Sequence, residues 1–431
     1  MIILTLLLLT PFDHATHSSY AINSKTQEIL LDDHGDTAQV PASCMKLVTT
    51  AAALHLLDPE MRFQTDLECD GTIDSKGILH GNLYIRGGGD PCLGSNRIPS
   101  TFNWEEQIQL WVSAIQTFGI KKIEGKVIGD ATLWEKALAV PSWDLEDLGN
   151  YYGAGASALS FHENYYTLTF KPGATVGAST DILRQDPPLP MITLLNEVTT
   201  GPLNSGDCAC IYGSEFSLTQ RICGTIPMGV TSFSIKGAIP NPAMSCSYLL
   251  SQALENSKIT IDKKALAQHK KRLLIHTTHS PPLKEIIYWT NQKSINLYAE
   301  HLLKKMGETV LGEGSTSAGI KAVTTFWQSQ GIDLKGFNMA DGSGLSRKNR
   351  ITAKQLVAIL LKMKGSPHFP FFLKSLPEPL PHCKAKSGSM TLIKGYAGFI
   401  DEIAFAILVN QSSDVEIKDE IKKILLELCP K

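Results

Sequence analysis

The pattern of hydrophobic and polar residues predicts strands and helices at both ends of the chain. Residues 18–33, SSYAINSKTQEILLDD, alternate with a period of two around a polar turn, which predicts two short strands. Residues 41–57, PASCMKLVTTAAALHLL, are mostly apolar and alanine-rich, which predicts a helix. Strands are predicted again over residues 396–411. The following segment, 414–429, favours a helix with one apolar side, formed by Val415, Ile417, Ile421, Ile424, Leu425 and Leu428.

The middle of the chain has a different pattern. From about residue 63 to about residue 240, short alternating runs are separated by glycine and proline, as in residues 77–94 and 121–134. Helical periodicity is confined to a few segments, namely 103–119, 245–257 and 293–308. Because helices and strands at the two ends enclose a long β-rich stretch, the pattern favours one split domain interrupted by an insertion.

Composition indicates a folded protein with no global attraction to polyanions. The 431 residues suggest two or three domains, and 43% hydrophobic with 19% charged residues is typical of a globular chain. The formal net charge is only −2, so no overall field would draw in nucleic acid or an anionic membrane. We therefore expect no nucleic-acid partner and at most peripheral membrane contact.

The first ten residues, MIILTLLLLT, have the length of a signal-peptide core but are too short to span a bilayer. They favour export over a buried first element, although a basic leader and a clear cleavage site are missing. The nine cysteines form no CxxC pair, so most are expected to be buried thiols, with disulfides an open alternative. His276 and His279 lack a third ligand, and we expect neither a metal nor a cofactor.

The candidate chemistry begins with Ser43 and Lys46 in the predicted helix 41–57. Residues three apart share a helix face, so a lysine with a lowered pKa could take the proton of the serine hydroxyl. The alternative is that Ser43 only caps the helix and Lys46 is solvated. A bare SxxK pair occurs about once in a chain of this length by chance and proves little alone.

Two later triplets change this interpretation. Ser294-Ile295-Asn296 begins a predicted helix, and Lys386-Ser387-Gly388 leads into predicted strands. An acyl-serine enzyme needs a nucleophile with its base, a proton relay to the leaving amine, and a cation for an anionic substrate end. Ser294 and Asn296 could supply the relay and an amide contact, while Lys386 and Ser387 could hold a carboxylate. Gly388 would leave room for substrate beside the strand.

The ordered set SxxK, SxN and KSG resembles the motifs of penicillin-binding proteins and serine β-lactamases. The long interval between the first two motifs resembles the low-molecular-mass class C penicillin-binding proteins, the D-alanyl-D-alanine carboxypeptidase/endopeptidase family. Further similar stretches include residues 81–91, GNLYIRGGGDP, 151–161, YYGAGASALSF, and 339–352, MADGSGLSRKNRIT. The third motif departs from the usual KTG but keeps its hydroxyl. The GSG sequence around Ser343 lacks the GxSxG pattern of a nucleophile elbow.

The resemblance implies a role for each motif residue. Ser43 would be acylated, Lys46 would activate it, and Ser294 and Asn296 would pass a proton to the departing D-alanine. The substrate carboxylate would be bound by Lys386 and Ser387, and the oxyanion by backbone N–H groups of Ser43 and Ser389. The resemblance also implies a pocket for a diaminopimelate-type side chain, formed by Asp147, Tyr152 and Met390. An ordinary solvated acid is an equally good interpretation of Asp147.

The implied fold is α/β, a transpeptidase-like domain with a five-stranded antiparallel sheet and helices on both faces. It would comprise residues 1–62 and 271–431, with an inserted β-rich domain of residues 63–88 and 163–270 and a nested domain of residues 89–162. The implied function is serine-type D-Ala-D-Ala carboxypeptidase action on peptidoglycan stem peptides in the periplasm or cell envelope, with β-lactams as covalent inhibitors. Endopeptidase action on cross-links, β-lactamase activity and a non-hydrolytic binding or sensing role remain alternatives.

Overall fold

The computed structural model of the chain describes residues 12, 15–264, 266, 271–412 and 416–429. The apolar run 1–10 and Val415 lie outside the described residues. The chain divides into two units, Met1–Met61 with Pro282–Lys431 and Arg62–Pro281. The second boundary follows Pro281 rather than residue 270, because strand β16 (Leu273–His279) pairs with β3 (Gln64–Cys69) inside the inserted unit.

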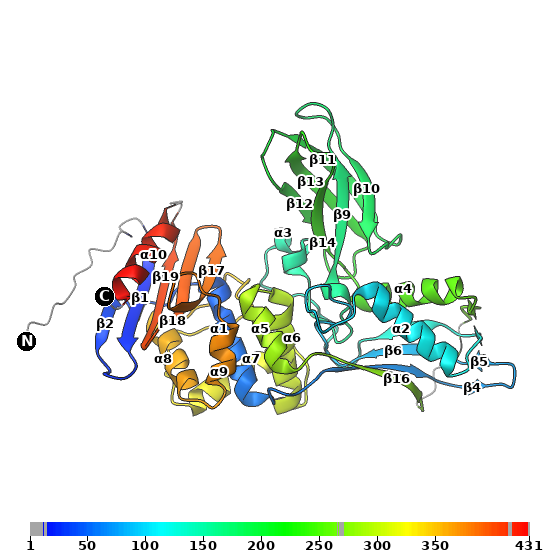
Figure 1. Cartoon of the computed structure of the whole chain (residues 1–431), viewed down its shortest axis with the longest axis horizontal. Coiled ribbons are helices and arrows are strands. Elements are labelled where there is room, and N and C mark those ends of the chain that lie inside the picture. Colours follow the sequence, from blue (N-terminus) through cyan, green and yellow to red (C-terminus); the bar gives the residue numbers. More distant parts are fainter. Residues whose placement is uncertain (1–11, 13–14, 265, 267–270, 413–415, 430–431) are drawn as a thin grey trace, which may run out of the picture. The chain divides into compact units, whose positions relative to one another are not determined.

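The first unit contains a five-stranded antiparallel sheet (Figure 1). Its strand order is β17-β18-β19-β1-β2, so the two ends of the chain meet where β1 pairs with β19. This sheet confirms the expected fold class and the strands expected at both chain ends. The bounds are β1 Thr16–Asn23, β2 Ile29–Asp33, β17 Cys383–Met390, β18 Ile393–Ile400 and β19 Ile403–Asn410.

Helices cover both faces of this sheet because its strands alternate between two apolar surfaces. On one face, Ala21 and Leu31 join a core with Ile421 of α10. On the other, Ser18 accepts a hydrogen bond from the N–H of Ala353, at the start of α8. The helices of this unit are α1 Met45–Leu56, α5 Leu283–Gln292, α6 Asn296–Leu311, α7 Thr316–Ser329, α8 Ala353–Lys364, α9 Phe369–Ser375 and α10 Ile417–Leu428.

Helix α1 is buried on all sides, which explains its lack of a polar stripe. Every residue from Met45 to Leu54 is buried. A helix that is apolar all round belongs in the centre of a packed unit, where other helices surround it. Lys46 of the first motif therefore lies on a helix that is buried on all sides, one turn after Ser43.

The second unit is rich in short strands, as expected for the middle of the chain. Two four-stranded sheets have the orders β16-β3-β6-β8 and β15-β7-β5-β4, and two three-stranded sheets have the orders β10-β9-β14 and β11-β13-β12. The further strands are β4 Thr72–Ile73, β5 Ile78–His80, β6 Leu83–Gly87, β7 Lys122–Ile123, β8 Val127–Asp130, β9 Tyr165–Lys171, β10 Asp181–Asp186, β11 Thr193–Gly201, β12 Cys208–Tyr212, β13 Thr219–Pro227, β14 Phe233–Ala238 and β15 Thr260–Ile261.

Three helices accompany these strands, namely α2 Trp104–Thr117, α3 Leu145–Leu148 and α4 Pro242–Asn256. Helix α2 begins with a capping box, in which Asn103 and Glu106 each accept a backbone N–H of the other. Its buried Trp111 belongs to the core of the unit. The further division of this unit into an inserted and a nested domain stays a prediction.

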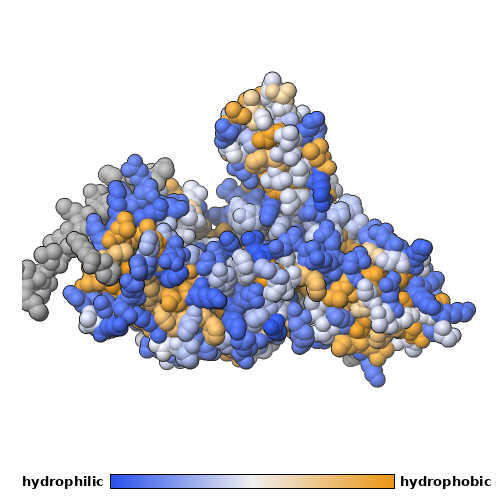
Figure 2. Space-filling view, in the orientation of Figure 1, coloured by the Kyte–Doolittle hydropathy of each residue, from blue (hydrophilic) through white to orange (hydrophobic). Residues whose placement is uncertain are grey.

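All nine cysteines are free thiols, among which Cys208 is exposed. Among the described residues, no helix combines the length and apolar character needed to cross a bilayer. The face shown in Figure 2 is largely hydrophilic, with scattered apolar patches in both units. Such a mixture of polar surface and scattered apolar residues is ordinary for a folded protein.

Candidate active site

Ser43 lies on a single helical turn that leads into α1. This turn, η1 (Ala42–Cys44), is a 3-10 helix, and Cys44 occupies the N-cap position of α1. No side-chain hydrogen bond caps η1 or α1, so the simple capping role considered for Ser43 is wrong. The Ser43 side chain is partly exposed, whereas Cys44 is fully buried. Burial raises the pKa of the Cys44 thiol to about 12, which makes it a poor nucleophile.

The amine of Lys46 donates hydrogen bonds to three acceptors. Its Nζ donates to Ser43 Oγ at 3.1 Å and to Asn296 Oδ1 at 2.6 Å. A third hydrogen bond, of 2.7 Å, reaches the backbone carbonyl of Ser343. The first and second motifs thus meet at a single amine, a contact that the sequence motifs alone did not specify. Because all three acceptors are uncharged, the amine has hydrogen-bond partners without a directly bound counter-ion.

The pKa of Lys46 falls from its ordinary value to about 7. Burial is the largest cause, since the side chain has no exposed surface, and the cation of Lys386 acts in the same direction. The carboxylates of Asp341 and Glu300 oppose this shift. A lysine in this state exists in both protonation forms near neutral pH, which is what a general base requires.

The second motif occupies the turn between α5 and α6. Ser294 has a positive φ of 55°, and α6 begins two residues later at Asn296. The left-handed conformation at Ser294 lets the chain reverse so that the first residue of α6 reaches Lys46. Ser294 is partly exposed. Its part in a proton relay stays a prediction.

The third motif lies on β17, the terminal strand of the sheet, against η1. Cys44 Sγ donates to the backbone carbonyl of Lys386 at 3.4 Å. A Cβ placed on Gly388 would clash with the carbonyl oxygen of Pro41 and approach Cys44 Sγ at 3.2 Å. Only glycine allows the strand to come this close to the nucleophile turn. The Gly388 contact explains the glycine of the motif by packing against η1, rather than only by space for substrate.

Lys386 brings a second buried cation to this region. Its side chain is 2% exposed, and Nζ donates to the backbone carbonyl of Ser387 at 2.7 Å. Burial lowers the pKa of Lys386 to about 8. The positive charge of Lys386 in turn lowers the pKa of the Lys46 amine.

Sequence reasoning missed the residues that hold the Ser343 carbonyl in place. Glu300 is buried and accepts the backbone N–H groups of Gly342 at 3.1 Å and Ser343 at 2.8 Å. Asp341 accepts the N–H groups of Gly344 and Ser346. A signal was available for Glu300, because it lies one helical turn after Asn296 and therefore on the same side of α6. No comparable signal identifies a backbone carbonyl.

The remaining predicted substrate residues lie in both units. In the first unit, Ser389 follows the third motif and is exposed, and Met390 ends β17 and packs against the cluster of Val40, Ala42 and Ile393. In the second unit, Asp147 is on α3 and Tyr152 on the turn η2 (Tyr151–Gly153). Burial and a hydrogen bond with Asp147 raise the pKa of Tyr152. The pairing of these two side chains is found, while their role toward a substrate stays a prediction.

Comparison with known proteins identifies the family of the chain. Residues 10–378 match the model of the D-Ala-D-Ala carboxypeptidase 3 (S13) family. The D-alanyl-D-alanine carboxypeptidase of Actinomadura sp. (strain R39) is 26% identical over 443 residues, covering 91% of this chain and 77% of that protein. The D-alanyl-D-alanine carboxypeptidase DacB of Haemophilus influenzae is 24% identical over 430 residues, covering 94% and 87% of the two chains.

The fold agrees with this assignment. The crystal structure of penicillin binding protein 4 (dacB) from Haemophilus influenzae superposes with a TM-score of 0.80 at 21% identity, covering 97% of both chains. A complex of the same protein with a β-lactam superposes with a TM-score of 0.76. Motifs, fold and family match together show that the chain belongs to the D-Ala-D-Ala carboxypeptidase 3 (S13) family, within the low-molecular-mass class C penicillin-binding proteins.

Proposed function

We propose that the protein hydrolyses the terminal D-Ala-D-Ala bond of peptidoglycan stem peptides through an acyl-enzyme on Ser43. The observation that carries this proposal is the buried amine of Lys46, which contacts Ser43 Oγ and whose pKa is lowered to about 7. A serine alcohol needs a neighbouring base that is unprotonated at working pH, and this amine meets the requirement.

In the acylation step, the neutral amine of Lys46 takes the hydroxyl proton of Ser43. Oγ then forms a bond to the carbonyl carbon of the penultimate D-alanine, and the carbonyl oxygen becomes an oxyanion. Backbone N–H groups of Ser43 and Ser389 would stabilise this charge, and each such donor is typically worth about 3 to 4 kcal/mol. When the C–N bond breaks, a proton delivered by way of Ser294 leaves with the D-alanine amine.

In the deacylation step, water attacks the ester on Ser43, with Lys46 again as the proton acceptor. The ester bond breaks, the proton taken from water passes from Lys46 to Oγ, and the shortened peptide leaves as a carboxylic acid that releases its remaining proton to solvent. Asn296 holds the Lys46 amine through an uncharged oxygen at 2.6 Å, so it orients the base without fixing it in the ammonium form. A charged acceptor at this position would favour the protonated lysine.

Substrate recognition would rest on charge and on the free edge of β17. The ammonium of Lys386, with the hydroxyl of Ser387, is suited to the terminal carboxylate of the peptide. The terminal position of β17 in its sheet supports binding of the peptide as an added strand. Asp147 and Tyr152, joined by a hydrogen bond, and Met390 are the proposed contacts for the amine end of a diamino acid side chain.

β-Lactams are proposed as covalent inhibitors, because their carboxylate and strained amide present the same groups to Lys386 and Ser43. The same reasoning leaves room for endopeptidase action on cross-links, since only the group beyond the scissile bond differs. Because peptidoglycan lies outside the cytoplasmic membrane, we propose that the protein is exported and acts in the periplasm or cell envelope. We propose no nucleic-acid partner and no more than peripheral membrane contact.

The decisive experiment labels the full chain with a fluorescent penicillin and maps the modified peptide. We expect label on Ser43 and its loss in Ser43→Ala, while Ser329→Ala, at an exposed serine of the same unit, keeps it. Incubation with a tripeptide ending in D-Ala-D-Ala is expected to release D-alanine. Label that persists in Ser43→Ala would remove the proposed nucleophile.

The alternatives give different outcomes in the same assays. A β-lactamase would turn over penicillin rapidly, whereas we expect the acyl-enzyme to persist. The sequence after the second motif contains no ExxLN stretch with the glutamate that one large β-lactamase class uses for deacylation. A sensing or binding protein would take the label but liberate no D-alanine.

A further inference from the structure

A cluster of two histidines and one aspartate lies at the opposite end of the sheet from the third motif. His17 is on β1, Asp33 is the last residue of β2, and His34 follows it. The sheet order places β18 and β19 between β17 and β1, and β2 forms the far edge. The cluster is therefore separate from the residues around Lys46, and the proposed hydrolysis does not use it.

Strand register explains why these residues meet. Asp33 pairs with Ser19, and His17 lies two residues before Ser19, so both side chains point to the same face of the sheet. His17 is opposite Val409, which belongs to the core beneath α10, so the cluster lies on the face that α10 covers. His34 has a positive φ of 53°, which turns its side chain back toward Asp33.

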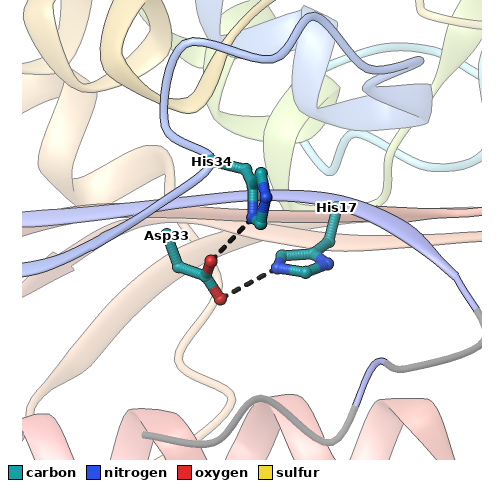
Figure 3. Close-up of side chains that lie close together, drawn as sticks. All are labelled: His17, Asp33 and His34. Carbon is teal, nitrogen blue, oxygen red and sulfur yellow. Dashed lines mark hydrogen bonds and ion pairs between the residues drawn. The ribbon is translucent and has the colours of Figure 1, made fainter. Parts of the chain in front are cut away.

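The three side chains converge on one carboxylate, as Figure 3 shows. His17 Nε2 lies 2.8 Å from one oxygen of Asp33, and His34 Nδ1 lies 2.7 Å from the other. One ligand atom from each residue falls within 4.8 Å of the other two. Each oxygen of the Asp33 carboxylate thus faces one imidazole nitrogen.

The dimensions of the cluster suit a small divalent ion. Zinc bonds to imidazole nitrogen and carboxylate oxygen are about 2.0 to 2.2 Å long, so donor atoms around a tetrahedral ion lie about 3.3 Å apart. The imidazole–carboxylate separations, 2.8 Å from His17 to Oδ2 and 2.7 Å from His34 to Oδ1, are shorter than this, and one ligand atom from each residue lies within 4.8 Å of the other two, so the donor separations need to change by no more than about 1.5 Å. His17 is 10% exposed and held against the ring of Phe12, whereas His34 is 65% exposed, so one ligand is fixed and another can adjust to admit the ion.

Imidazole and carboxylate donors favour first-row transition cations over magnesium or calcium, which prefer oxygen ligands alone. We propose that His17, Asp33 and His34 bind one divalent transition-metal ion of the zinc type, through His17 Nε2, a carboxylate oxygen of Asp33 and His34 Nδ1. Water would complete the coordination. The bound ion would fasten β1 to the end of β2, and so stabilise the far edge of the catalytic sheet. Neutral histidines would keep their proton on the other ring nitrogen.

The test is isothermal titration of the metal-stripped, tag-free full chain with zinc chloride. We expect one equivalent to bind and the melting temperature to rise with zinc concentration. Asp33→Asn and His34→Ala should each weaken binding by more than about tenfold, since losing even an outer partner of a metal ligand costs that much. His382→Gln is the matched control, because His382 forms an exposed pair with Asp401 at 3.6 Å without a third ligand.

Cobalt(II) and magnesium distinguish the proposed transition-metal site from a site with cysteine ligands and from a magnesium site. Cobalt(II) bound by nitrogen and oxygen should show visible d–d absorption without the thiolate charge-transfer bands that ligation by cysteine would produce. Excess magnesium should not displace it. Absence of saturable zinc binding, thiolate bands, equal competition by magnesium, or binding unchanged in both Asp33→Asn and His34→Ala would each overturn the proposal. Penicillin labelling of these variants reports their folding independently of zinc.

Discussion

The side-chain oxygen of Asn296 and the amine of Lys46 lie 2.6 Å apart, shorter than the 3.1 Å between that amine and Ser43 Oγ. The base is therefore held most tightly by an uncharged group from a helix distant in sequence. This hydrogen bond joins residues of two different motifs. Because it ends on the amine nitrogen of Lys46, the charge of the side chain at position 296 affects the protonation state of that amine.

Replacing Asn296 by aspartate tests that effect. A carboxylate at this distance would raise the pKa of Lys46 and keep it as ammonium at neutral pH. We expect acylation by a fluorescent penicillin to slow more than tenfold at pH 7 and to recover in part as the pH rises. Asn338→Asp adds the same charge at an exposed position and should leave the rate unchanged. An unaltered rate in Asn296→Asp would contradict the role of Lys46 as base.

The native protein should show a bell-shaped dependence of acylation on pH. Acylation needs neutral Lys46, whose pKa is about 7, so the rate should fall about tenfold per unit below that value. Binding of the carboxylate needs charged Lys386, whose pKa is about 8, so the rate should decline again above it. In Lys386→Arg the cation persists at all accessible pH values, and the alkaline decline should disappear. A native profile that is flat from pH 6 to pH 9, or an alkaline decline retained in Lys386→Arg, would count against these assignments.

Glu300→Gln tests whether Glu300 holds in place the backbone whose carbonyl orients Lys46. Glutamine offers one acceptor oxygen, so one of the buried N–H groups of Gly342 and Ser343 would lose its partner. Such a loss typically costs about 1 to 3 kcal/mol of unfolding free energy. We also expect slower acylation, because the Ser343 carbonyl that orients Lys46 would shift. Chemical denaturation and labelling kinetics measure the two effects.

The control for Glu300 lies on the same helix. Glu308 pairs with Lys305 at 2.7 Å near the surface of α6, and its replacement by glutamine should cost no more than about 1 kcal/mol. The pH profile separates positioning from simple destabilisation. The Glu300 charge raises the pKa of Lys46, but burial and Asp341 raise the pKa of Glu300 itself to about 7, so Glu300→Gln should move the acid limb only slightly to lower pH. An unmoved acid limb would leave Glu300 with a structural role alone.

Gly388→Ala should disrupt the contact between β17 and η1. The added methyl group would meet the backbone carbonyl of Pro41, which cannot move aside as a flexible side chain would. We expect acylation to fall strongly, since the strand carrying Lys386 would shift from the turn carrying Ser43. Gly365→Ala, where the nearest atom would be 3.6 Å away, should behave as wild type. Normal labelling of Gly388→Ala would show that the close approach is not needed.

Much of the fold could be predicted from sequence because its elements have strong local patterns. The strands at 18–33 and 396–411 and the helix after Pro41 are found close to their expected bounds. The boundary expected at residue 270 failed for a nonlocal reason. Strand β16 belongs to the inserted unit through contacts with distant segments, such as its pairing with β3, some 200 residues earlier, and no local pattern reports that pairing.

The residues of the candidate site likewise fall into those that the sequence could identify and those that it could not. Ser43, Lys46 and Asn296 were found because their chemistry is carried by side chains in recognisable triplets. Glu300 escaped because its carboxylate acts through the backbone of another segment, and the His17–Asp33–His34 cluster escaped because strand register, rather than spacing in sequence, brings it together. Contacts of this kind become visible only when the pairing of distant segments is known.

The pairing of β1 with β19 also sets an order of events during synthesis. β1 can pair with β2 soon after both are made, but Thr16 is opposite Asn410, so its second partner, β19, is made only after the whole inserted unit. The inserted unit, Arg62–Pro281, has its own core and is complete well before then. A nascent chain could thus carry a finished insertion before β19 completes the sheet beside Ser43, so hydrolytic activity would emerge only after β19 has been made.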